Sequence, residues 1–218
     1  MTTAEKLIEF IQKNRRLLFA GFIVIVVGLV GSLIGITVRE RVTINAFVQL
    51  DAIEQRFIAL QGYIAAPADG ENAEVAALLD DLDTFAARNS RFPAARAHGL
   101  RAVIFQEQER WLDAQQAWLA AANAAPRTYF APIALWNAAA AAEDYGDMEA
   151  AIALYARIVQ EHEAAFYIAA RAQFSIGRLE EARGAPEAAI AAYQSLLARW
   201  PHDTHADFAQ TRLIVLLY

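Results

Sequence analysis

Apolar and polar residues follow two successive patterns along the chain. Residues 17–38 form an unbroken apolar run. From residue 47 onward, apolar residues recur every three or four positions with polar residues between them. That spacing places the apolar side chains on one face of an α-helix. The chain is therefore predicted to be all-α, with one apolar N-terminal helix followed by amphipathic helices.

The apolar run predicts a transmembrane helix over residues 17–38. It holds 22 residues without a charge, and 15 of them are Leu, Ile, Val or Phe. A helix of that length spans about 33 Å, and the hydrocarbon core of a bilayer is about 30 Å thick. A buried core helix would keep a polar face. A cleaved signal peptide would end in small residues, whereas this run leads into Arg39-Glu40-Arg41. We therefore expect an uncleaved signal anchor.

Basic residues are more frequent before the apolar run than after it. Four precede it closely and two follow it: Lys6, Lys13, Arg15 and Arg16, then Arg39 and Arg41. Because Lys and Arg are retained on the cytoplasmic side, we expect a cytoplasmic N-terminus. Residues 1–16 are predicted to be an amphipathic cytoplasmic tail, or else an extension of the membrane helix. The remaining chain would then lie in the periplasm of a bacterium, anchored in the inner membrane.

Glycines in the apolar run share a helix face. Gly21, Gly28 and Gly35 recur every seven residues, with Gly31 close to the same face. Small residues let two membrane helices approach closely, so this pattern favours an association face and a homo-oligomer. The alternative is that these glycines form no association face, because glycine is common in membrane helices generally.

The segment 39–90 is predicted to form a membrane-proximal helix pair. The first apolar stripe runs from Phe47 to Ile64 and the second from Val75 to Phe85, with the helix-breaking sequence Pro67-Ala-Asp-Gly70 between them. The first helix of the pair could continue directly out of the membrane helix.

Residues 91–218 contain an internal repeat. Three related segments align at Ala114, Ala151 and Ala189, with spacings of 37 and 38 residues. Each carries a small residue at that position and an aromatic residue four positions later: Trp118, Tyr155 and Tyr193. This pattern resembles the tetratricopeptide repeat, nominally about 34 residues long. The resemblance implies an α-solenoid of helical hairpins, ending in a C-terminal capping helix over residues 204–218. An unrelated alanine-rich helical bundle is the alternative.

Small residues are expected where the two helices of each hairpin cross. On the alignment these positions are Ala102, Ala139 and Gly177 on the first helices and Ala114, Ala151 and Ala189 on the second. The closing sequence Leu213–Tyr218 is apolar on every side. It is expected either to fold against the chain or to contact a second molecule.

Composition excludes several kinds of function. The chain has no cysteine, which excludes disulfides, thiol catalysis and cysteine-ligated metals. Its net charge of -6 argues against nucleic-acid binding. The cluster His202-Asp203-Thr204-His205 is interpreted as a polar turn with Thr204 as N-cap, and not as a metal site. We expect neither a cofactor nor an enzymatic activity.

The resemblance to tetratricopeptide repeats implies a peptide-binding groove along the first helix of each hairpin. The groove candidates combine Arg donors with aromatic and amide side chains: Arg96, Gln106, Trp136, Asn137, Arg171, Phe174 and Arg178, with Val103 and Glu143 beside them. Trp136 and Phe174 could instead pack between helices. The Lys/Asn clamp of chaperone-binding members is not reproduced.

The order of segments also resembles the ancillary Sec translocon subunits of bacterial inner membranes, as do the sequences Phe174–Gly184, Ala189–Tyr193 and Arg199-Trp-Pro201. That resemblance implies protein partners such as translocon subunits or exported proteins, and hand-over to periplasmic chaperones. The predicted function is a membrane-anchored scaffold for protein–protein interactions. The alternative is a self-associating structural protein of the envelope without a dedicated client.

Overall fold

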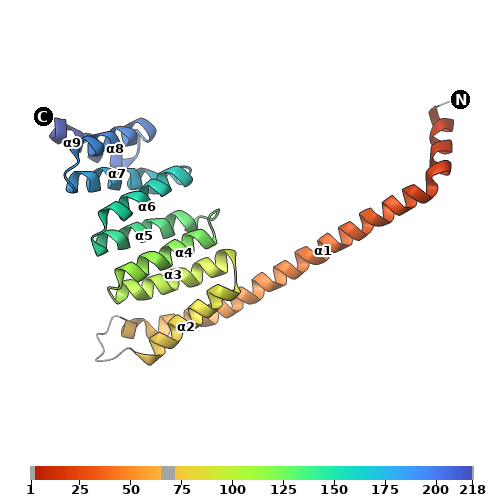
Figure 1. Ribbon diagram of the computed structural model, residues 1–218, viewed down its shortest axis with the longest axis horizontal. Helices are drawn as coiled ribbons and strands as arrows, with labels where there is room; N and C mark the ends of the chain where they lie inside the picture. Colours follow the sequence, from red (N-terminus) through yellow and green to blue (C-terminus); the bar gives the residue numbers. More distant parts are fainter. Residues whose placement is uncertain (1–2, 65–71, 218) are drawn as a thin grey trace. The chain divides into compact units, whose positions relative to one another are not determined.

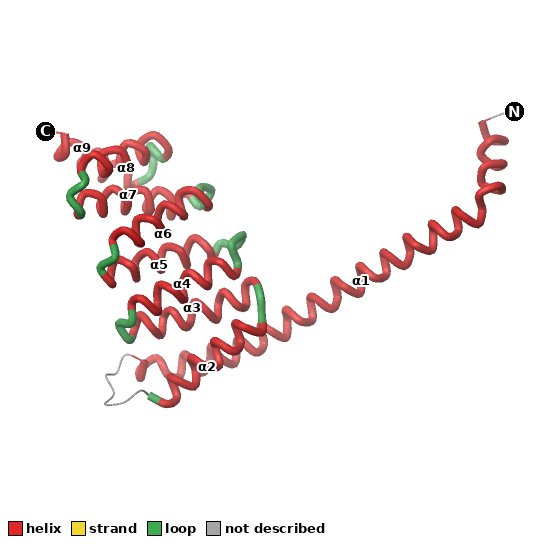
Figure 2. Tube along the Cα trace, in the orientation of Figure 1, coloured by secondary structure: helices red, strands yellow, loops and turns green. Residues whose placement is uncertain are grey.

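Every regular element in the described part of the chain is an α-helix (Figures 1 and 2). The computed structural model describes residues 3–64 and 72–217. Inside the first helix, it describes side chains only at Arg16, at part of 19–32 and from Arg41 on, with the exception of Val42. The side chain of Phe166 is also outside the description. The helices are α1 Thr3–Ile64, α2 Ala73–Arg88, α3 Arg91–Glu107, α4 Trp111–Ala124, α5 Phe130–Tyr145, α6 Met148–Glu161, α7 Phe166–Ala182, α8 Pro186–Arg199 and α9 Thr204–Leu217. The predicted all-α class is confirmed.

The chain divides into two compact units, Met1–Val48 and Gln49–Tyr218. Helix α1 runs through the division without a break, as the expected continuation of the N-terminal helix requires. In the first unit its described large apolar side chains are exposed, for example Val24 at 70% and Val27 at 64%. Over the part of the chain that the structure describes, no helix combines the length and hydropathy needed to cross a membrane. The predicted span 17–38 lies only partly within those residues.

The C-terminal part of α1 and helix α2 bury the two apolar stripes. The buried side chains are Leu50, Phe57, Leu60 and Ile64 on α1 and Val75, Leu78, Leu82 and Phe85 on α2. The first stripe is shorter than predicted, because Phe47 is 42% exposed and lies in the other unit. An ion pair between Arg56 and Asp81 joins α1 to α2.

Helices α3 to α8 form three successive hairpins, α3–α4, α5–α6 and α7–α8, which stack in chain order in the second unit (Figure 1). The predicted crossing alanines have no accessible surface: Ala102, Ala139, Ala114, Ala151 and Ala189. At the sixth crossing position, a Cβ atom added to Gly177 would lie 2.4 Å from Cε1 of Tyr193. Small residues therefore let the two helices of each hairpin approach closely.

The turn inside each hairpin uses one residue in the left-handed conformation. Gly146 has φ 89° and Gly184 has φ 77°, whereas the equivalent position in the first hairpin is Glu109, with φ 55°. Glycine adopts this conformation without a steric cost, and a residue with a Cβ atom is strained there by about 1 kcal/mol. The first hairpin thus keeps the turn geometry although it lacks the glycine.

Helix α9 buries one face of the apolar C-terminal sequence and exposes another. Leu213 is buried and Leu216 packs against the core. Ile214, Val215 and Leu217 are each more than half exposed. This sequence therefore folds in part against the chain, as one expectation stated, and the expected contact with a second molecule stays a prediction.

Candidate functional site

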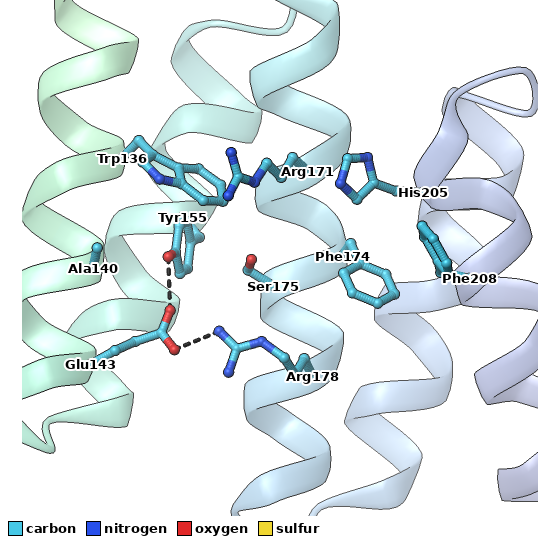
Figure 3. Close-up of a pocket in the computed structure, with 10 residues that line it drawn as sticks. All are labelled: Trp136, Ala140, Glu143, Tyr155, Arg171, Phe174, Ser175, Arg178, His205 and Phe208. Carbon is cyan, nitrogen blue, oxygen red and sulfur yellow. Dashed lines mark hydrogen bonds and ion pairs between the residues drawn. The ribbon is translucent and has the colours of Figure 1, made fainter.

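A pocket of about 580 Å³ is formed by side chains of helices α5, α7 and α9, with one residue from α6 (Figure 3). We call it the α5–α7–α9 pocket. It is lined by Trp136, Ala140 and Glu143 of α5, Tyr155 of α6, Arg171, Phe174, Ser175 and Arg178 of α7, and His205 and Phe208 of α9. Because α5 and α7 begin successive hairpins, the pocket depends on the stacking of the repeats.

One wall of the pocket is a stack of two aromatic rings and a guanidinium group. The ring centroids of Trp136 and Tyr155 lie 4.9 Å apart. Arg171 comes from α7, and its Cζ atom lies 4.1 Å from the Trp136 ring centroid. A cation over an indole face is attracted by the ring quadrupole. The guanidinium of Arg171 is thereby held at the pocket wall, as Figure 3 shows.

The floor of the pocket is a hydrogen-bonded ion pair. The Glu143 carboxylate accepts a hydrogen bond from the Tyr155 hydroxyl at 2.7 Å and another from Arg178 Nη2 at 2.5 Å. Glu143 thus joins the second helix of its own hairpin to the first helix of the next hairpin. Both oxygens of the carboxylate are used in this arrangement (Figure 3).

The same arrangement recurs in the last hairpin. The Tyr193 hydroxyl donates to Glu181 at 3.1 Å, and Arg212 of α9 donates to the same carboxylate through Nε at 3.1 Å. In the first hairpin, Trp118 Nε1 donates to Gln106 Oε1 at 2.9 Å. We call the hydrogen bonds Trp118–Gln106, Tyr155–Glu143 and Tyr193–Glu181 the repeat bonds. Each joins residues twelve positions apart, and this regularity could have been recognised in the sequence from the 37- and 38-residue spacings.

The opposite wall is aromatic and comes partly from the capping helix. Phe174 lies 5.7 Å from the His205 ring and 6.2 Å from the Phe208 ring. His205 Nδ1 is 2.7 Å from Asp203 Oδ1, and Phe208 is 60% exposed. The same Asp203 carboxylate accepts a hydrogen bond from the His205 backbone N–H at 2.8 Å. Asp203 therefore caps α9, and the expectation that Thr204 is the N-cap was wrong, because Thr204 is already the first helical residue.

The pocket brings together four of the seven predicted groove residues. Trp136, Arg171, Phe174 and Arg178 line it, and so does Glu143. Trp136 and Phe174 are half-buried and pack against the core, so each combines the two roles that the sequence left open.

The other three candidates lie outside the pocket. Arg96 forms an ion pair with Glu54 of α1 at 2.8 Å, and Gln106 is used in a repeat bond. Asn137 is half-buried beside Trp136 but does not line the pocket. Of the predicted helix-association face, Gly21, Gly28 and Gly31 face open space in this chain, and Gly35 lies outside the described side chains.

Sequence reasoning missed His205 and Phe208 as lining residues. They stand three positions apart on α9, and that spacing places both side chains on one face of a helix. Within the described residues, no three His, Asp or Glu side chains are grouped so as to hold a metal ion.

Burial and Glu143 both raise the pKa of the Tyr155 hydroxyl above its ordinary value, burial being the larger cause. In the unfolded chain this hydroxyl ionises near pH 10. The folded chain keeps the proton to higher pH, so its contribution to stability is present below about pH 10 and is lost as the pH rises further.

We therefore expect the free energy of unfolding to fall between pH 9 and pH 11, and to fall less in the variant Tyr155→Phe. Urea denaturation followed by circular dichroism at the two pH values measures the difference. An equal decline in both proteins would show that Tyr155 does not titrate differently in the folded and unfolded chains.

Stacked helical hairpins with small residues at each crossing and a pocket across successive first helices define an α-solenoid repeat protein. The chain is 32% identical over 222 residues to a TPR repeat-containing protein of Treponema pallidum (strain Nichols), covering 95% of this chain and 92% of that protein. The chain belongs to the tetratricopeptide repeat (TPR) proteins. No protein-family model matches it.

Proposed function

We propose that the protein is a membrane-anchored scaffold that binds segments of other proteins in the α5–α7–α9 pocket and has no catalytic activity. Membership of the TPR proteins supports a general role in protein–protein interaction. The single observation that carries the proposal is the pocket itself, where half-buried and exposed aromatic side chains lie beside an exposed Arg side chain across three helices. Such combinations are typical of protein-binding surfaces.

The membrane anchor is proposed from the N-terminal apolar run. The sequence has no charge from Leu17 to Val38, and the large apolar side chains that the structure describes within this run are exposed, including Phe22 at 62% and Ile25 at 62%. Apolar side chains on every side of a helix need an apolar surrounding. Lipid around residues 17–38 would supply it.

The proposed location is the inner membrane of a bacterium, with the N-terminus in the cytoplasm and the repeats in the periplasm. The proposal rests on the excess of Lys and Arg before the apolar run. In this place the scaffold would contact translocon subunits or exported proteins and assist their passage to periplasmic chaperones.

The anchor is tested by carbonate extraction of membranes from cells that express the full chain. We expect the wild-type chain to stay with the membranes, and the double variant Val24→Arg and Val27→Arg to be released, because each central Arg opposes insertion by about 3 kcal/mol. The matched control is Ile214→Arg with Val215→Arg, which adds the same charge to exposed positions on α9. Release of the wild-type chain, or equal retention of both double variants, would contradict the anchor.

The orientation is tested by adding protease to intact spheroplasts. We expect the repeats to be digested before lysis. Protection of the repeats until the cells are lysed would place them in the cytoplasm.

A second candidate function is self-association in the envelope. The favouring observations are the open faces of Gly21, Gly28 and Gly31 and the exposed side chains of Ile214, Val215 and Leu217. Crosslinking in membranes that yields only monomers would remove this candidate.

A further inference from the structure

Two Arg side chains of α7 line the α5–α7–α9 pocket, and they differ in how their charge is satisfied. Arg178 forms the 2.5 Å ion pair with Glu143. Arg171 is exposed and has no ion-pair or hydrogen-bond partner among the residues that the structure describes. Its Cζ atom lies over the Trp136 ring, 4.1 Å from the ring centroid.

Contact with the Trp136 ring restrains the Arg171 guanidinium, whose N–H groups have no acceptor among the described residues. A guanidinium presents five donors in a planar fork that matches the two oxygens of a carboxylate. Holding the fork in place lowers the side-chain entropy that an ion pair otherwise costs. Arg171 is thus prepared to bind an anion.

The pocket beside this cation has an aromatic wall and is wide enough for a bulky side chain. The Phe174 and Phe208 rings are 6.2 Å apart, and Phe208 is 60% exposed. The volume of about 580 Å³ lies within the range of ligand pockets in proteins. A ligand that reached Arg171 would therefore also contact aromatic surface.

The negative charge of the surrounding chain should confine the binding of acidic ligands to the unpaired Arg171. Residues 42–218 hold 13 Arg and no Lys against 22 acidic residues. Such a surface repels acidic segments in general, so an acidic ligand is favoured only where a cation is unpaired. Within the pocket, Arg178 and Glu143 neutralise each other, and Arg171 supplies the remaining positive charge.

We propose that the pocket binds an extended peptide segment in which an Asp or Glu side chain pairs with Arg171 and a neighbouring bulky apolar side chain enters beside Phe174 and Phe208. This inference rests on the proposed function and names the chemistry of the partner. In an extended chain, side chains two positions apart lie about 7 Å apart on the same face. The ligand pattern is thus an acidic residue and a large apolar residue with one residue between them.

The test measures binding of three fluorescein-labelled peptides to the full-length protein in detergent, by fluorescence anisotropy. Their cores are Glu-Ala-Phe-Ala, Gln-Ala-Phe-Ala and Lys-Ala-Phe-Ala, each amidated at the C-terminus, so that they differ only in the side chain two positions before Phe. We expect the acidic peptide to bind at least about tenfold more tightly than the Gln peptide, the size of one charge-assisted hydrogen bond. We expect the Lys peptide to bind most weakly.

Arg171→Gln is expected to weaken the acidic peptide about tenfold and to leave the Gln peptide unchanged. The matched control is Arg127→Gln, which removes the same charge from an exposed position in the α4–α5 turn. It is expected to change neither affinity. Thermal denaturation by circular dichroism confirms that both variants fold.

Three results would overturn the inference: equal binding of the Glu and Gln peptides, equal losses in the two Arg variants, or preference for the Lys peptide. If the peptides bind without a charge preference and Phe208→Ala weakens all of them, the proposed function stands and only the acidic partner is wrong. If none of the three peptides binds, the pocket is not a peptide site and both proposals fail.

Discussion

Replacing Gly177 with alanine is expected to lower the free energy of unfolding by about 2 kcal/mol. The new Cβ atom would lie 2.4, 2.7 and 2.8 Å from three carbon atoms of the Tyr193 ring. Tyr193 is 1% exposed and its hydroxyl is held by Glu181, so the ring has little freedom to move away. Overpacking of this kind costs up to about 3 kcal/mol, and the better helix propensity of alanine offsets about 1 kcal/mol.

The matched control for Gly177 is Gly62→Ala in helix α1. A Cβ atom at Gly62 meets nothing within 4 Å, so only the helix propensity changes and stability should rise by about 0.5 kcal/mol. Urea denaturation of the two variants measures the opposite signs. Equal effects would show that the close approach of α7 and α8 does not depend on the missing side chain at Gly177.

Replacing Glu143 with alanine is expected to cost about 2 kcal/mol of stability. The change leaves the Tyr155 hydroxyl, on a residue that is 2% exposed, without its acceptor. A buried hydrogen-bonding group without a partner costs about 1–3 kcal/mol. The lost ion pair with Arg178 adds less, because the Arg178 side chain is 48% exposed and such pairs are screened by solvent.

A double-mutant cycle separates these two contributions. The double variant Glu143→Ala and Tyr155→Phe removes both ends of the hydrogen bond, so it should be less destabilised than the sum of the single variants. The control Asp144→Ala removes a neighbouring exposed carboxylate and should change stability by less than about 0.5 kcal/mol. Strict additivity in the cycle would show that the Tyr155–Glu143 bond contributes nothing to stability.

The alanine pattern made the helical hairpins predictable. Ala114, Ala151 and Ala189 recur at almost constant spacing because two backbones can approach only where side chains are small, and all three are fully buried. This constraint acts within one hairpin, between residues close in the sequence. The fold class therefore followed from local pattern alone.

Much of the pocket depends on contacts that local pattern does not specify. Arg178 meets Glu143 across 35 positions, and Arg96 is diverted to Glu54 across 42. Which carboxylate each Arg side chain reaches is decided by how neighbouring elements pack. The sequence therefore predicted that Arg and aromatic side chains would gather on the first helices, and it could not tell that Arg171 would remain unpaired while Arg96 would not.

Contacts between helices of the second unit join neighbours in the chain, or helices one element apart such as α5 with α7 and α7 with α9. A chain organised in this way has no single centre that must form before the rest can fold. Opening should then begin at α9, which contacts only α7 and α8 among the described helices. Amide hydrogen exchange should record this as a gradient of protection, with the middle hairpin α5–α6 exchanging last.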